Sequence, residues 1–238
     1  MQRLNQFLTC TLLAASLAAC QTPANRTDEV PKHSRAVPAP AFSWAGSWSD
    51  TIPCADCPGI LTRLDLRADS TYVLRSLYLE RDSIPQGQIG KWTVKDDILV
   101  LATADVPMRW GVKGDALEML GQDGKPAESA LPYTVQRMAA PDTAAMHLAG
   151  AYVYYADSHG FTPEGAGFVL PVAMDPPGVK GAALELERAY ARRVKTPPDP
   201  LYVRITASLR EGPAMEGNGT EEYLHVLRVE QAEVAPAP

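Results

Sequence analysis

Apolar and polar residues alternate along much of the chain between residues 44 and 138, and this alternation predicts β-strands. In segment 60–66 one face consists of Ile60, Thr62, Leu64 and Leu66, and the other face is mostly charged. The pattern resumes at residues 71–74 after a turn at 68–70. Five further strands are predicted at 88–94, 97–102, 107–113, 115–120 and 132–138. Short antiparallel strands at this spacing are typical of a barrel or a sandwich.

A second, smaller β-rich domain is predicted after a linker at 139–147, where the sequence contains Pro-Asp-Thr. Its strands are expected at 150–155, 167–172, 201–209 and 222–230. Residues 181–193 predict a helix, in which Leu186, Tyr190 and Val194 recur at helical spacing and Glu185 can pair with Arg188. Strands around one helix in about 90 residues fit a small five-stranded barrel such as an OB-fold.

The N-terminus has the pattern of a secretory signal, with Arg3 followed by a short apolar run at 7–16 and then small residues. The sequence Leu17-Ala18-Ala19-Cys20 resembles the lipobox of bacterial lipoproteins, which implies that Cys20 is lipidated and becomes the mature N-terminus. A membrane-helix fragment or an ordinary signal with a chance cysteine is the alternative. Gln21 in place of Asp resembles the sorting pattern for the outer membrane, so a periplasm-facing outer-membrane lipoprotein is expected.

These patterns divide the chain into six segments. They are a signal peptide at 1–19, lipidated Cys20 with a proline-rich disordered tether at 20–41, a β-barrel at 42–138, a linker at 139–147, an OB-like domain at 148–233 and a frayed tail at 234–238. The fold class is therefore mainly β.

Charge and known catalytic patterns limit the function. The 238 residues carry a formal net charge of −6 without a basic run, which argues against nucleic acid as a partner. The sequence contains no Gly-x-Ser-x-Gly elbow, phosphate loop, His-Glu-x-x-His or dinucleotide fingerprint. We expect a protein that is not an enzyme and that contacts the membrane through its lipid anchor.

Cys54 and Cys57 form a C-x-x-C flanked by Pro53 and Pro58, and three interpretations stay open. A disulfide closing so short a loop stabilises the fold by only about 2 kcal/mol. A thioredoxin-like redox pair normally opens a helix, whereas a strand is predicted here. Two reduced thiolates suit Cu(I), while a disulfide offers none. Asp56 is expected to oppose thiolate formation.

The string Pro53-Cys54-Ala55-Asp56-Cys57-Pro58-Gly59-Ile60 resembles the NlpE family of outer-membrane lipoproteins. Further matching pieces are Gly46-Ser47-Trp48, Leu64-Asp65-Leu66, Asp69-Ser70-Thr71-Tyr72, Gly90-Lys91-Trp92, Tyr154-Tyr155-Ala156-Asp157, Pro171-Val172-Ala173 and Leu186-Glu187-Arg188-Ala189-Tyr190. The resemblance implies a lipocalin-like barrel, an OB-like domain, and roles in copper tolerance and envelope stress. The chain departs from the family at Asp50 and Ile52, and at Glu164-Gly165, where Asp-Cys is often found.

The sequence therefore predicts a non-enzymatic outer-membrane lipoprotein in envelope-stress sensing and copper homeostasis, with a stress-signalling protein as partner. The alternatives are a lipocalin-like carrier of a small apolar ligand and a C-x-x-C redox protein. Core or surface roles are the default for the remaining chemistry-bearing side chains: His33, His147, His159, His225, Met108, Met119, Trp44, Trp48, Trp92 and Trp110.

Overall fold

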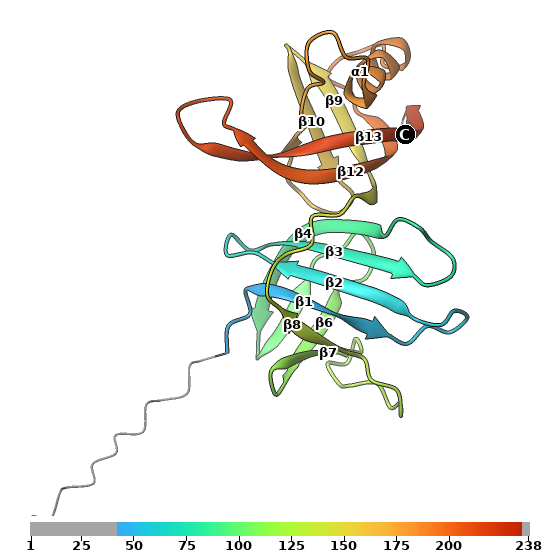
Figure 1. The fold of residues 1–238 in the computed structure, drawn as a ribbon, viewed down its shortest axis with the longest axis vertical. Helices are drawn as coiled ribbons and strands as arrows, with labels where there is room; N and C mark the ends of the chain where they lie inside the picture. Colours follow the sequence, from blue (N-terminus) through green and yellow to red (C-terminus); the bar gives the residue numbers. More distant parts are fainter. Residues whose placement is uncertain (1–41, 235–238) are drawn as a thin grey trace, which may run out of the picture. The chain divides into compact units, whose positions relative to one another are not determined.

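A computed structural model describes residues 42–234, and its first eight strands close into a barrel (Figure 1). Each strand is antiparallel to the next, β8 pairs with β1, and β4 pairs with both β3 and β5. This up-and-down connection confirms the lipocalin-like barrel. The strands are β1 (Gly46–Ile52), β2 (Ile60–Leu66), β3 (Thr71–Tyr78), β4 (Gln86–Lys95), β5 (Ile98–Leu101), β6 (Met108–Lys113), β7 (Ala116–Leu120) and β8 (Thr134–Met138).

The period-two pattern sets the inside of the barrel. On β2 the predicted inner residues Thr62, Leu64 and Leu66 are buried, and the two leucines join the barrel core. Asp65, on the opposite face of the same strand, is buried as well. Alternation predicts which face a residue occupies, but it does not predict what else covers the outer face.

The β4–β5 hairpin turns at Asp96 and Asp97, so the second strand begins one residue later than the predicted 97–102. Both residues have a positive φ, 53° and 57°, which is the backbone of the two-residue turn that matches strand twist. Aspartate tolerates this conformation better than most non-glycine residues. The turn therefore fixes the register in which Trp92 faces Leu101.

The remaining strands form the second barrel, as the OB-fold prediction required. β9 pairs with β10 and β12, β12 pairs with β13, and a bridge from Val172 to Leu224 connects the chain after β11 to β13. The elements are β9 (Met146–Tyr155), β10 (Ser158–Pro163), β11 (Leu170–Pro171), α1 (Ala182–Arg193), β12 (Leu201–Pro213) and β13 (Thr220–Val234).

Several local predictions for this domain were wrong. The predicted strand at 167–172 is only the two-residue β11, since Gly167 has a φ of 71° and the strand begins later. β10 was not predicted, because Gly160 and Pro163 weaken its pattern. β9 begins at Met146, inside the predicted linker at 139–147. Among the ion pairs of the described residues, none joins Glu185 to Arg188.

Helix α1 packs against the domain through the residues predicted at helical spacing, since Leu186, Tyr190 and Val194 are all buried. Its N-cap residue, Gly181, offers no side chain, and the backbone N–H of Leu184 instead donates to Asp175 Oδ2 at 2.8 Å. A Cβ on Gly181 would lie 1.9 Å from Asp175 Oδ1. A glycine at this position is therefore what lets a distant aspartate cap the helix.

The N-terminal predictions cannot be compared with this structure. The signal peptide, Cys20, the tether at 20–41 and the last four residues of the tail lie outside the described residues. Within residues 42–234, no helix combines the length and the hydropathy needed to cross a membrane.

Acidification is expected to destabilise the C-terminal domain through His159. This side chain is buried, and its Nδ1 lies 2.7 Å from the Tyr152 hydroxyl. Burial lowers the pKa of His159 below its ordinary value, although the charges of Glu187 on α1 and Asp157 in the β9–β10 turn oppose this effect. Tyr154 covers the ring from the same sheet, with centroids 4.5 Å apart.

Because the unfolded state takes up a proton first as the pH falls through about 6.5, the contribution of His159 is complete above that pH and is lost below it. Thermal melts at pH 7 and pH 5 should therefore show a smaller decrease for His159→Gln than for the wild type. An equal decrease would mean that other groups, such as carboxylates, account for the acid sensitivity.

Candidate functional site

The C-x-x-C lies in the loop that joins β1 to β2. The register pairs Ile52 with Ile60, so residues 53–59 protrude from the end of this hairpin. Cys54 and Cys57 are joined by a disulfide, with their Cα atoms 5.3 Å apart, and both are partly exposed. A Cβ on Gly59 would lie 2.4 Å from Thr51 Cγ2, so glycine lets the loop return close to β1. The sulfurs are thus held at an accessible place at one end of the barrel wall.

Arg81, from the loop between β3 and β4, holds the tip of the C-x-x-C loop. Its Nη2 lies 2.7 Å from Asp56 Oδ2 and donates to the Asp56 carbonyl oxygen at 2.9 Å. The hydrogen bond to Asp56 and the charge of that carboxylate raise the pKa of Arg81. The contact joins residues 25 positions apart, and no local pattern signals it. The negative charge that was expected to oppose thiolate formation is therefore paired with a cation.

The donor set of this loop fits a soft metal ion only when the cysteines are reduced. Ligand atoms of Cys54, Asp56 and Cys57 all lie within 4.8 Å of one another. Cys54 Sγ is 3.5 Å from Asp56 Oδ1, and Cys57 Sγ is 3.3 Å from the carbonyl oxygen of Gly59. Two thiolates are soft ligands suited to Cu(I), whereas the carboxylate is hard and adds little for that ion.

The other candidate ligands lie elsewhere. Met108 and Met119 pack against the barrel core. His147 pairs with Glu230, and His159 pairs with Tyr152. Among the residues that the structure describes, no histidine joins the cysteines in a potential metal-binding group.

The barrel interior is filled by its own side chains. Trp48 and Trp110 are both completely buried, and Trp44 and Trp92 pack against the same cluster. Leucines at 64, 66, 74, 99, 101 and 117 complete this core. The tryptophans therefore pack the core, and this arrangement gives no support to a carrier of a small ligand.

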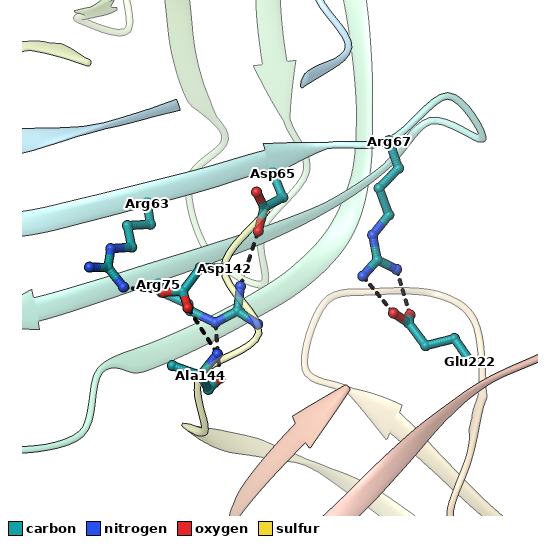
Figure 2. A network of polar contacts seen from close by, with 7 residues as sticks. All are labelled: Arg63, Asp65, Arg67, Arg75, Asp142, Ala144 and Glu222. Carbon is teal, nitrogen blue, oxygen red and sulfur yellow. Dashed lines mark hydrogen bonds and ion pairs between the residues drawn. The ribbon is translucent and has the colours of Figure 1, made fainter. Parts of the chain in front are cut away.

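A second polar constellation, which the sequence did not reveal, lies on the outer side of β2 and β3 (Figure 2). Arg75 Nη1 lies 3.2 Å from Asp65 Oδ2, and the exposed fractions of the two side chains are only 2% and 8%. Arg75 Nε also donates to the carbonyl oxygen of Ala144 at 3.3 Å. Arg63 pairs with Asp142, so the segment between β8 and β9 is bound to the barrel at two points.

Arg67 adds a third ion pair to this constellation. Its two terminal nitrogens donate to Glu222 of β13 at 2.5 and 2.8 Å, a bidentate arrangement (Figure 2). Burial lowers the pKa of Arg75, and the charges of Asp142 and Asp65 oppose that effect. Burial alone would raise the pKa of Asp142, but hydrogen bonds from Arg63 and the Ala144 N–H keep it below its ordinary value.

The chain is similar in sequence to a known lipoprotein. Lipoprotein NlpE of Escherichia coli (strain K12) is 38% identical over 149 residues, which make up 60% of this chain and 59% of that relative. The match thus spans less than two thirds of the relative's length.

Two solved structures are also similar. The crystal structure of the Cpx pathway activator NlpE from Escherichia coli matches at 31% identity, covering 76% of this chain and 92% of that one, with a TM-score of 0.34. A putative lipoprotein from Shewanella oneidensis matches at 27% identity, covering 42% of this chain and 93% of that one, with a TM-score of 0.37.

Two family models account for consecutive parts of the chain. The NlpE N-terminal domain matches residues 48–130, which include the C-x-x-C loop, and the NlpE C-terminal OB domain matches residues 142–236. Since these two segments make up most of the sequence and coincide with the two barrels of the structure, the chain belongs to the NlpE family.

Proposed function

We propose that this protein is a non-enzymatic lipoprotein of the bacterial outer membrane that takes part in envelope-stress signalling and in copper homeostasis. The observation that carries the proposal is the accessible C-x-x-C loop within the segment that matches the NlpE N-terminal domain. The E. coli relative is described as a lipoprotein and as a Cpx pathway activator, which supports the signalling part.

The anchor is assigned to Cys20, which would hold the protein at the periplasmic side of the membrane. Acyl chains contribute about 0.8 kcal/mol for each buried methylene, so a lipidated N-terminus gives stable attachment. The partner is then a signalling protein of the envelope that recognises the folded domains.

The copper part of the proposal is assigned to Cys54 and Cys57. In the oxidising envelope the pair rests as the disulfide seen here, and reduction provides two thiolates for one Cu(I). Arg81 binds Asp56 and so restrains the loop that carries both sulfurs. The C-x-x-C would thus respond to the redox state of the envelope as well as to copper.

Replacing Cys20 with alanine is expected to remove both anchoring and signalling. Expressed in a bacterium with an envelope-stress reporter, the full wild-type chain should enter the membrane fraction, incorporate labelled palmitate and raise the reporter signal. Cys20→Ala should incorporate no label, leave the membrane fraction and give a smaller reporter response.

Cys10→Ala is the matched control, since Cys10 lies within the predicted signal peptide and should be removed with it. Membrane attachment of Cys20→Ala together with an unlabelled wild type would contradict the lipoprotein assignment. A labelled, membrane-bound wild type that leaves the reporter unchanged would contradict the signalling role alone.

A thiol oxidoreductase is the second candidate, and the joined cysteines favour it. Such a role requires one exposed thiol with a lowered pKa. If it holds, the reduced protein should turn over a model disulfide, and Cys54→Ser and Cys57→Ser should abolish turnover. Absence of turnover, with both thiols titrating near or above about 8.5, would leave the non-enzymatic function as the better account.

A further inference from the structure

Three arginines lie together on the outer side of the barrel, and we call them the arginine face: Arg63 of β2, Arg67 directly after the end of β2, and Arg75 of β3. Asp65 lies between the first two on the same side of β2, and the register places Arg75 directly opposite Arg63. Like charges directly opposite one another in a sheet destabilise it unless anions separate them. Asp65 is one carboxylate for three guanidinium groups, so the face by itself is positive.

The missing acceptors come from outside the barrel. Asp142 and the carbonyl oxygen of Ala144 in the β8–β9 segment bind Arg63 and Arg75, and Glu222 of β13 binds Arg67 (Figure 2). The Ala144 N–H donates to Asp142 Oδ1 at 2.9 Å, which holds this aspartate and the Ala144 carbonyl in one local turn. Thus one aspartate, Asp142, and one glutamate, Glu222, complete the charge balance of the face.

Apolar side chains lie on the same outer side and are covered as well. Val73 of β3 and Ile89 of β4 belong to the core cluster of the C-terminal domain, together with Met146 and Leu148. A Cβ on Gly87 of β4 would lie 2.6 Å from Met146 Sδ, so the glycine allows close approach of β9. The face therefore combines guanidinium donors with an apolar margin, which is the composition of a protein-binding surface.

Two ion pairs, Arg63–Asp142 and Arg67–Glu222, join the two domains beside these buried apolar residues. Contacts between domains of one chain resemble transient interfaces unless they are large and hydrophobic. Arg63 and Arg67 retain about a third of their side-chain exposure, so water can replace their partners when the segment leaves. Arg75 would move from a nearly buried position to an accessible one.

We propose that the arginine face is a docking surface for an extended acidic segment of a partner protein, and that residues 142–144 and Glu222 occupy it in cis until that partner displaces them. The partner is identified by its chemistry: a carboxylate that pairs with Arg63 and backbone carbonyl groups that accept from Arg75. The arginine face is a different site from the C-x-x-C loop. This proposal therefore does not depend on copper or redox chemistry.

The test uses the full chain and a fluorescent synthetic peptide that copies residues 139–147. The variant Asp142→Asn/Glu222→Gln removes the competing carboxylates and keeps their shapes. We expect it to bind the peptide at least tenfold more tightly than the wild type, and more weakly as the salt concentration rises. Adding Arg63→Gln and Arg67→Gln to that variant should abolish binding.

The matched control is the same peptide with asparagine in place of its aspartate, which should bind at least tenfold more weakly. Equal binding of the two peptides, displacement of the peptide by inorganic phosphate at the same concentration, or no gain in the variant would overturn the proposal. Should the variant fail to fold, hydrogen exchange of the wild type answers the question. Saturating peptide should speed exchange at the amide of Ala144, and unchanged exchange would refute displacement.

Discussion

Replacing Asp65 with asparagine is expected to lower the free energy of unfolding of the barrel by about 3 kcal/mol. The substitution keeps the shape of the side chain but leaves the buried guanidinium of Arg75 without its nearest carboxylate. Removing one partner of a buried ion pair costs about 3–5 kcal/mol, because the remaining charge is uncompensated. We expect the lower end of this range, because the Ala144 carbonyl still accepts a hydrogen bond from Arg75 and the charge of Asp142 still stabilises its guanidinium.

Urea denaturation followed by tryptophan fluorescence measures this effect selectively, because all four tryptophans belong to the first barrel. The double variant Asp65→Leu/Arg75→Met should be more stable than Asp65→Asn, since it removes both charges and retains apolar volume. Asp115→Asn, in an exposed turn, should change the stability by less than about 0.5 kcal/mol. A loss below about 1 kcal/mol for Asp65→Asn would show that Arg75 does not depend on this carboxylate.

The reduced protein is expected to bind one equivalent of Cu(I), and the oxidised protein none. Loss of a residue that only supports a metal ligand weakens binding by about 10–100-fold. Cys54→Ser and Cys57→Ser should each weaken Cu(I) binding by more than that, because each removes a direct ligand. Anaerobic competition with a Cu(I) chelator under reducing conditions provides the measurement.

Arg81→Gln is the control for the loop, since it releases Asp56 and leaves both thiols in place. Its effect on the Cu(I) affinity should be about tenfold or smaller. Equal copper retention by the wild type and the variant with both cysteines replaced would show that the C-x-x-C is structural and that any copper phenotype is indirect.

Local sequence patterns predicted the strands of the first barrel except β1, because two physical signals agree in the other seven. One side of each strand is apolar, and Asp or Gly residues mark the turns between strands, as at Asp96–Asp97. The same signals were weaker in the C-terminal domain. Gly160 and Pro163 concealed β10, and an apolar run at 167–172 suggested a longer strand than β11.

Spacing alone also identified the cysteine pair as the candidate site, because a turn over four residues brings cysteines three positions apart within disulfide distance, and their Cα atoms are 5.3 Å apart here. It could not identify Arg81, which reaches the loop only because β2 and β3 form a hairpin whose far end returns to Asp56. The ligand potential was therefore visible in the sequence, whereas the electrostatic environment was not.

The sequence by itself determined which residues face the barrel core, where the main turns lie, which segment forms the helix and which two thiols can react together. Each of these depends on neighbours within a few positions. Only the tertiary structure decided that the outer side of β2 and β3 is also covered, with Asp65 and Arg75 buried there and bound to residues near 142 and 222. The reason is that burial of an outward-facing charge depends on which distant segment packs over it, and alternation along a strand carries no information about that segment.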